Sequence, residues 1–153
     1  MSDLENTKCN TVSPRRFPAA RVWFAMAGVY YLGISMLSQI SGQTLNQLPF
    51  SFWDKGAHFA VYGGLGCLLC LGFLQIFEGR IKAVVISLLV ASILGCLDEV
   101  HQMFVPGRFA GLDDVAADAL GALVGAGMGV LAVGIYFRKR EKAGASAVSL
   151  RPS

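Results

Sequence analysis

The sequence has few charged residues, only two histidines and no recognisable grouping of a catalytic nucleophile with a base. Charged residues make up 15% of the chain and hydrophobic residues 54%, a balance that excludes an ordinary soluble domain of 153 residues. Three of the four cysteines, Cys67, Cys70 and Cys96, lie inside apolar segments, which excludes the paired framework of a disulfide-rich secreted domain. We therefore expect an integral membrane protein.

Four apolar segments are long enough to cross a hydrocarbon core of ~30 Å as helices. A polar arm over residues 1–21 precedes them, and a basic tail over residues 138–153, which we expect to be disordered, follows them. The expected fold is all-α, a four-helix transmembrane bundle within a membrane domain at 22–137. The predicted helices cover residues 22–41, 55–77, 81–103 and 114–137.

The basic residues are distributed unequally between the two sides of the predicted bundle. Eleven of the 13 lysines and arginines lie in the arm, the turn at Arg80 and the tail, where they flank apolar segments. This pattern excludes nucleic-acid binding as their purpose and places both termini in the cytoplasm. The opposite face has only Lys55 and Arg108 against six of the ten acids, so we expect an acidic outer face.

Ionisable residues from three predicted helices reach one depth near the outer edge of the hydrocarbon. Counting ~1.5 Å per residue, His58, Asp98 and Asp118 lie about 33, 24 and 30 Å from the cytoplasmic basic residues that anchor their helices. Groups at one depth on three helices predict a shared, outward-facing polar site.

The predicted site includes neighbours of these three residues on the same helix faces and in the adjoining loop. No catalytic residue and no metal site is assigned from the sequence, and the cofactor is unknown. The candidate ligand-binding residues are Asp98, Glu99, Arg108, His58, Gln102, Asp114, Asp54, Lys55, Tyr62, His101 and Asp118.

Some of these acids have a simpler interpretation as helix N-caps. Asp54, Asp113 and Asp114 stand where predicted helices begin, and a carboxylate there accepts backbone N–H bonds. That interpretation fails for Asp98, near the C-terminal end of its helix, and for Asp118, a full turn inside the fourth helix. Acids at such depth are costly, so a function or a specific partner is the default hypothesis.

The partner expected for the acids Asp98 and Glu99 is Arg108, with Lys55 second. A pair of this kind could also act only as a clamp between loops. The two histidines could likewise do no more than satisfy a neighbouring polar group.

Glycines continue the face of Asp118 along the fourth predicted helix. Gly121, Gly125 and Gly129 form two overlapping Gly-x-x-x-Gly motifs, which allow another helix to approach closely. We therefore predict a packing face below the acids.

Three patterns in the chain resemble those of the VanZ-like family of small bacterial membrane proteins. They read roughly D-K-x-x-H-F-x-x-Y from Asp54, D-E-x-x-Q-x-F-x-P-x-R from Asp98 and D-x-x-x-N-x-x-G-x-x-x-G from Asp114. The chain departs from the third pattern at position 118, where it has Asp and the family often has Asn. The resemblance implies a multi-pass protein of the bacterial inner membrane and cell envelope. The family is named for an accessory protein that raises tolerance to teicoplanin, a lipid-tailed glycopeptide antibiotic.

Three functions remain open at this point. The first is a non-enzymatic protein that binds a cationic amphiphile or a lipid-linked ligand in the acidic outer pocket, in contact with the lipid bilayer. The second is a metal-dependent membrane enzyme acting on a lipid or lipid-linked substrate, with Zn²⁺ or Mn²⁺ held by the histidines and acids. The third is a structural or assembly subunit that packs through the glycine stripe. The oligomeric state is not predicted.

Overall fold

The computed structural model describes residues 17–40, 54–108 and 111–149. Every regular element in these ranges is a helix, and each contains a segment long and apolar enough to cross a membrane. This confirms the predicted all-α architecture with four candidate membrane spans. The helices are α1 (Ala20–Leu37), α3 (Asp54–Phe73), α4 (Arg80–Gln102) and α5 (Leu112–Ser149).

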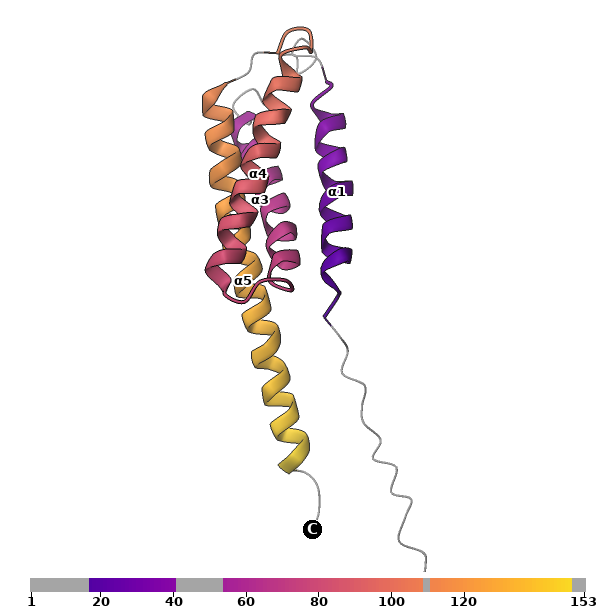
Figure 1. Cartoon of the computed structure of the whole chain (residues 1–153), viewed down its shortest axis with the longest axis vertical. Coiled ribbons are helices and arrows are strands. Elements are labelled where there is room, and N and C mark those ends of the chain that lie inside the picture. The colour runs from indigo at the N-terminus through magenta and orange to yellow at the C-terminus, as the bar shows by residue number, and fades with distance from the viewer. Residues whose placement is uncertain (1–16, 41–53, 109–110, 150–153) are drawn as a thin grey trace, which may run out of the picture.

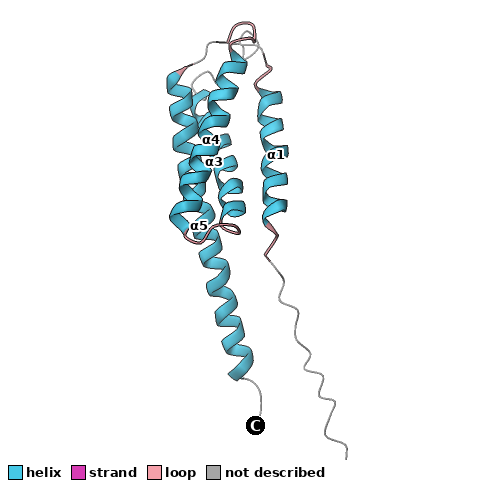
Figure 2. Ribbon diagram, in the orientation of Figure 1, coloured by secondary structure: helices cyan, strands magenta, loops and turns pink. Residues whose placement is uncertain are grey.

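The helices α3, α4 and α5 pack together, and α1 runs alongside them (Figures 1 and 2). One end of the molecule contains the start of α1, the end of α5 and the turn between α3 and α4 (Figure 1). We call this the basic end, because it carries Arg80, Lys82 and Arg138. The opposite end, where α4 ends at Gln102 and α5 begins at Leu112, is called the polar end.

The most extensive helix–helix contact joins α3 to α5, and glycines allow it. A Cβ added at Gly121 would collide with the backbone of Phe59, and one added at Gly125 would collide with the backbone of Gly63. The two backbones therefore touch, and we call this contact the glycine seam. Because α3 of the same chain covers these glycines, they do not offer the docking face for a second polypeptide that the assembly hypothesis requires.

The seam loosens towards the basic end. A Cβ added at Gly129 would lie 3.3 Å from the carbonyl oxygen of Cys67 and 3.4 Å from the Cβ of Cys70, close to ordinary contact. Cys70 is fully buried there, and both cysteines are free thiols that act as small packing residues.

Helix α1 is much less enclosed than the other three. Only 11% of its membrane-span window is buried, compared with 39% for α3. Its inward face includes Phe24, Ala27, Tyr31 and Ile34, whose spacings of three and four residues keep them on one side of the helix, and Ser38 follows on the same side directly after the helix ends. These side chains lie at the contact with the bundle.

The helix ends differ from the predicted boundaries most strongly in α5. The structure corrects the expectation of a disordered tail from residue 138, because α5 continues to Ser149. Residues after Phe137 include lysine, arginine, glutamate and alanine, all strong helix formers, and no proline interrupts them before the helix ends. At the other boundaries, α1 ends at Leu37 rather than at residue 41, and α3 ends at Phe73 rather than at residue 77. Most of the predicted N-terminal arm lies outside the described residues.

Candidate functional site

Buried polar side chains gather at the polar end of the bundle. The carboxylate residues Asp98, Glu99 and Asp118 are only 2%, 4% and 0% exposed, and Ser38 and Gln102 are buried with them. These residues form two groups with different partners. We call the first the Asp98 network and the second the His58 cluster.

The Asp98 network joins α1, α4 and the residues that follow α4. Ser38 Oγ donates a hydrogen bond of 2.8 Å to Asp98 Oδ2, and Gln102 Nε2 donates one of 3.0 Å to the same oxygen. Arg108 Nη1 in turn donates to Gln102 Oε1 at 3.1 Å, and Arg108 Nε donates to the Ile40 carbonyl at 3.3 Å. Neutral donors therefore hold the buried carboxylate, and Gln102 links it to the guanidinium that the sequence predicts as its partner.

A pocket of about 230 Å³ lies beside the Asp98 network, between α1, α3 and α4. Buried Asp98 Oδ1 has no hydrogen-bond partner among the described residues. Apolar and polar side chains both line this pocket, and α3 contributes both kinds. The apolar residues are Ile34, Leu37, Ile40, Ala57 and Val61, and the polar residues are Ser38, His58, Tyr62, Asp98, Gln102 and Arg108.

Two tyrosines bond the same backbone carbonyl in α4. Tyr31 from α1 and Tyr62 from α3 donate their hydroxyls to the Leu94 carbonyl oxygen at 3.2 and 3.4 Å. Tyr62 is 1% exposed, so its hydroxyl satisfies the rule that a buried polar group is paired. The shared carbonyl ties three helices together one turn below Asp98.

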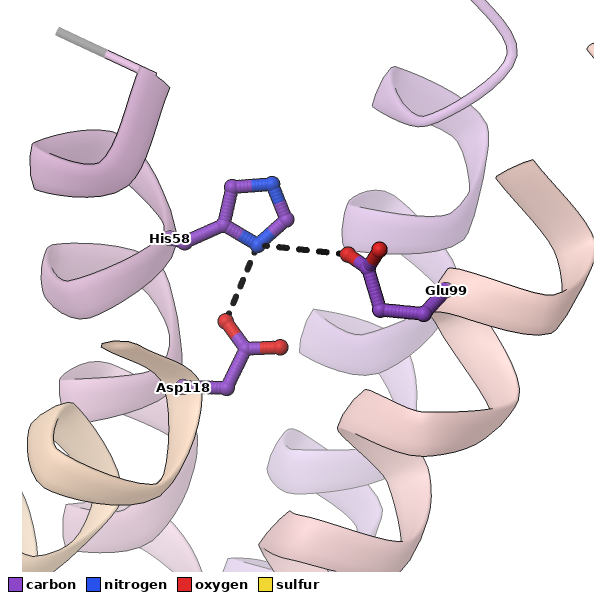
Figure 3. A group of neighbouring side chains, drawn as sticks. All are labelled: His58, Glu99 and Asp118. Atoms are coloured by element: carbon purple, nitrogen blue, oxygen red, sulfur yellow. Dashed lines mark hydrogen bonds and ion pairs between the residues drawn. The ribbon is translucent and has the colours of Figure 1, made fainter. Parts of the chain in front are cut away.

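The His58 cluster brings one side chain from each of α3, α4 and α5 to a common point (Figure 3). His58 Nδ1 lies 3.0 Å from Asp118 Oδ1 and 3.9 Å from Glu99 Oε1. The second oxygen of Glu99, Oε2, accepts a 3.0 Å hydrogen bond from the Gly111 backbone N–H. An imidazole thus faces two buried carboxylates.

A glycine in α4 makes room for the carboxylate of Asp118. A Cβ added at Gly95 would lie 2.8 Å from Asp118 Oδ2 and 3.2 Å from its Cβ. Any larger residue at position 95 would press on the acid, so the sequence of α4 fits the acid that α5 carries.

Among the remaining predicted site residues, Lys55 and His101 have partners outside both groups, whereas Asp114 interacts electrostatically with His58, Glu99 and Asp118. Lys55 forms an exposed ion pair with Asp113. Asp113 and Asp114 are the acids in the first turn of α5, where the helix dipole favours them. His101 contacts Gln39 at 2.8 Å between their Nε2 atoms, on the side of α1. Asp54 begins α3, and its side chain lies outside the described part of the chain.

Several participants in the site were not anticipated from the sequence, among them Tyr31, Gln39 and the Ile40 carbonyl. Ser38, the Gly111 N–H and the Leu94 carbonyl also belong to them, and each makes a hydrogen bond described above. The three backbone groups leave no side-chain signal. Ser38 does leave a signal in the sequence, because it is a polar residue in an otherwise apolar segment. It follows Tyr31 by seven residues, which is two helical turns along the same face.

Comparison with known proteins gives a family match. A family model described as VanZ/LLP1 matches residues 10–133, which include all of α1, α3 and α4 and most of the membrane-spanning part of α5. Neither the curated proteins nor the solved structures contain a match to this chain.

Proposed function

This chain belongs to the VanZ/LLP1 family of membrane proteins, and from that premise we propose that its polar end binds the headgroup of an amphiphilic or lipid-linked ligand. The observation that carries the proposal is the pocket of about 230 Å³, whose lining combines apolar side chains with Asp98 and Arg108. An amphiphile presents the same combination of a polar head and an apolar body.

The size of the pocket favours a headgroup rather than a whole ligand. Pockets that enclose a drug-sized molecule have volumes of roughly 300–1,000 Å³, so about 230 Å³ accommodates only part of such a molecule. Because α1 forms one side of the pocket and is little buried, the remainder of the ligand can extend into the surrounding lipid.

The polar side chains that line the pocket favour a ligand that donates hydrogen bonds. Asp98 Oδ1 is buried and lacks a hydrogen-bond donor in the described chain, which is costly for a carboxylate oxygen. An ammonium or hydroxyl group of a ligand would supply that donor. A cationic or hydroxyl-bearing headgroup is therefore the preferred class.

Binding can be tested with amphiphiles that co-purify with the protein in lipid nanodiscs, identified and quantified by mass spectrometry. We expect Asp98→Asn and Arg108→Gln to reduce the bound amphiphile at least tenfold. Glu78→Gln and Arg80→Gln, which change an acid and an arginine at the basic end, should retain it. Wild-type occupancy in both site variants would reject the proposal.

We further propose that the polar end faces away from the cytoplasm, with both termini inside. The support is the charge distribution, because the basic residues flanking the spans gather at the end opposite the site. Reporter domains fused after residue 153 test this orientation. A cytoplasm-dependent reporter should be active there and a periplasm-dependent reporter inactive, and the reverse result would contradict the proposal.

A link to glycopeptide tolerance follows as a narrower hypothesis, since teicoplanin is itself an amphiphile. Expression of the chain in a susceptible Gram-positive host should raise the inhibitory concentration of teicoplanin but not that of a glycopeptide without a lipid tail. An equal effect on both compounds, or on neither, would reject the link to teicoplanin tolerance. The proposal that the pocket binds an amphiphile would be unaffected by that result.

A second candidate function is a metal-dependent enzyme acting on the same amphiphile. One observation favours it, namely that His58 belongs both to the pocket lining and to the His58 cluster. Conversion of the co-purified amphiphile on addition of Zn²⁺ or Mn²⁺, lost in His58→Gln, would support this function. If neither ion changes the amphiphile, the enzymatic function is rejected and the binding function remains as proposed.

A further inference from the structure

We propose that His58, Glu99 and Asp118 form a binding site for one divalent transition-metal ion of the Zn²⁺ or Mn²⁺ class. The three side chains come from three different helices, and each offers a ligand atom within 4.8 Å of the other two. The inference goes beyond ligand binding in the pocket, because Glu99 and Asp118 do not line that pocket.

The spacing of the donor atoms fits a metal centre. Bonds of about 2.0–2.2 Å in a tetrahedral arrangement place neighbouring ligand atoms about 3.3–3.6 Å apart. The distances from His58 Nδ1 are 3.0 Å to Asp118 Oδ1 and 3.9 Å to Glu99 Oε1, on either side of that range. The ligand atoms of Glu99 and Asp118 lie within 4.8 Å of each other, so the cluster contracts when all three side chains bind one ion.

The charge of the cluster favours a divalent cation. Two carboxylates that are 4% and 0% exposed face one imidazole, so at most one positive charge opposes two negative charges. Buried charge without compensation is strongly unfavourable, above all in a membrane. A divalent ion bound by a neutral imidazole and two carboxylates balances the charge of its three ligands, and the nearby carboxylate of Asp114 favours a cation further.

Two oxygen atoms in the cluster have unused capacity as ligands. Glu99 Oε1 and Asp118 Oδ2 are buried and accept no hydrogen bond from the described residues. Glu99 Oε1 is also the oxygen that faces His58 Nδ1 (Figure 3). Glu99 Oε1 can therefore accept a bond from an ion without giving up a hydrogen bond, at a position where a buried acceptor is nearly always paired.

The surroundings orient the proposed ligands. The Gly111 N–H holds Glu99 Oε2 and so directs Oε1 towards the cluster, a supporting contact of the kind that metal-binding carboxylates usually have. Nε2 of His58 points away from both carboxylates, which leaves Nδ1 as the coordinating nitrogen (Figure 3). Both features are present without an ion.

Three protein ligands leave at least one coordination position open, as in catalytic rather than structural zinc sites. His58 lines the pocket, so exchange of water or of a ligand donor atom at that position can take place from the pocket side. The site would therefore be loaded and emptied by added ions and chelators.

The test uses the full chain in lipid nanodiscs, stripped with a chelator and titrated with ZnCl₂ or MnCl₂ by calorimetry and elemental analysis. We expect one ion per chain. Affinity should fall at least tenfold in His58→Gln, Glu99→Gln and Asp118→Asn, a loss typical of removing a ligand. His101→Gln and Asp113→Asn are matched controls outside the cluster and should bind like the wild type.

Pulsed electron paramagnetic resonance of the wild-type protein loaded with Mn²⁺ tests coordination by an imidazole directly, before any variant is compared. Coupling from one imidazole nitrogen should be present, and it should disappear in His58→Gln. No stoichiometric ion, an ion whose affinity is unchanged in all three variants, or a spectrum without nitrogen coupling would each overturn the proposal. Those results would leave the amphiphile test standing, because it depends on Asp98 and Arg108.

Discussion

Two helix contacts in the molecule are built from different groups. They are the glycine seam between α3 and α5 and the contact of α1 with the bundle. At the seam, backbone approaches backbone, and no side chain is needed at Gly121 or Gly125. At α1, polar side chains reach across to α4 through the Ser38–Asp98 and Gln39–His101 contacts and through Tyr31 to the Leu94 carbonyl. The α1 contact also includes apolar packing on α3, where Ala27 and Ile34 are buried and the ring centroids of Phe24 and Phe73 lie 4.9 Å apart. Backbone packing thus dominates the seam, whereas the α1 contact combines side-chain packing with hydrogen bonds.

The difference matters because lipid removes the hydrophobic driving force between helices. In a bilayer, helices associate through van der Waals packing at small residues and through hydrogen bonds between helices. The seam uses the first of these and carries His58 and Asp118 on its two helices. The α1 contact adds the second to its side-chain packing on α3, and it closes the pocket. The His58 cluster is therefore built on the tightest contact, and the pocket on the most exposed helix.

The largest effect is expected where the seam is obstructed. Gly125→Ala places a methyl group against the Gly63 backbone, and because neither backbone can yield without separating the helices we expect a loss of at least about 3 kcal/mol. Thermal unfolding and the yield of monodisperse protein in detergent measure it. Gly127→Ala, on the same helix with nothing within 4 Å, should be neutral or slightly stabilising. Equal stability of the two variants would contradict the seam as described.

An intermediate effect is expected at Gly95, where a methyl group would meet the end of a side chain rather than a backbone. Gly95→Ala should cost about 1–2 kcal/mol, because Asp118 can shift but its buried position leaves little room. The displaced carboxylate should also weaken Zn²⁺ binding in the titration described above. A fully stable variant with unchanged Zn²⁺ affinity would show that this contact does not position Asp118.

A smaller effect is expected from the hydrogen bond that joins α1 to Asp98. Ser38→Ala removes a 2.8 Å donor to the buried carboxylate and should cost about 0.6–1.7 kcal/mol, from the average to the maximum for hydrogen bonds between membrane helices. Thermal unfolding measures the cost, and Ser38→Thr, which keeps the hydroxyl, serves as control. If alanine and threonine variants unfold at the same temperature, the hydrogen bond does not hold α1.

The smallest effect is expected at Tyr31. Tyr31→Phe removes one of two donors to the Leu94 carbonyl, and the Tyr62 hydroxyl remains, so the loss should be at most about 0.6 kcal/mol. The double variant with Tyr62→Phe leaves the carbonyl without either hydroxyl and should lose more than the two single losses combined. Strict additivity in unfolding experiments would contradict a shared acceptor.

The fold could be predicted from the sequence because its determinants are local. Each span is recognised by the length of an apolar segment with few charges, and these segments correspond to α1, α3, α4 and α5. The end of α5 could not be placed in this way, since the residues after Phe137 are polar enough for a tail but have the propensity of a helix. Composition and helix propensity disagree there, and the helix continues.

The site was less accessible to sequence reasoning. Counting residues along helices gives depth, and it brought His58, Asp98 and Asp118 to the same level. It does not give the rotation of each helix about its axis, which packing at the glycine seam determines. For this reason the sequence could not separate Asp98, which contacts Ser38, from Asp118, which contacts His58.

The length of α5 has a practical consequence for work on this protein. At ~1.5 Å per residue its 38 residues extend about 57 Å, nearly twice the ~30 Å of a hydrocarbon core. The helix is therefore long enough to continue beyond the lipid. The turns that follow the apolar segment carry Arg138, Lys139, Arg140 and Lys142. A fluorophore or affinity tag joined to the C-terminus would be carried clear of the lipid surface, at the end of the molecule farthest from the pocket.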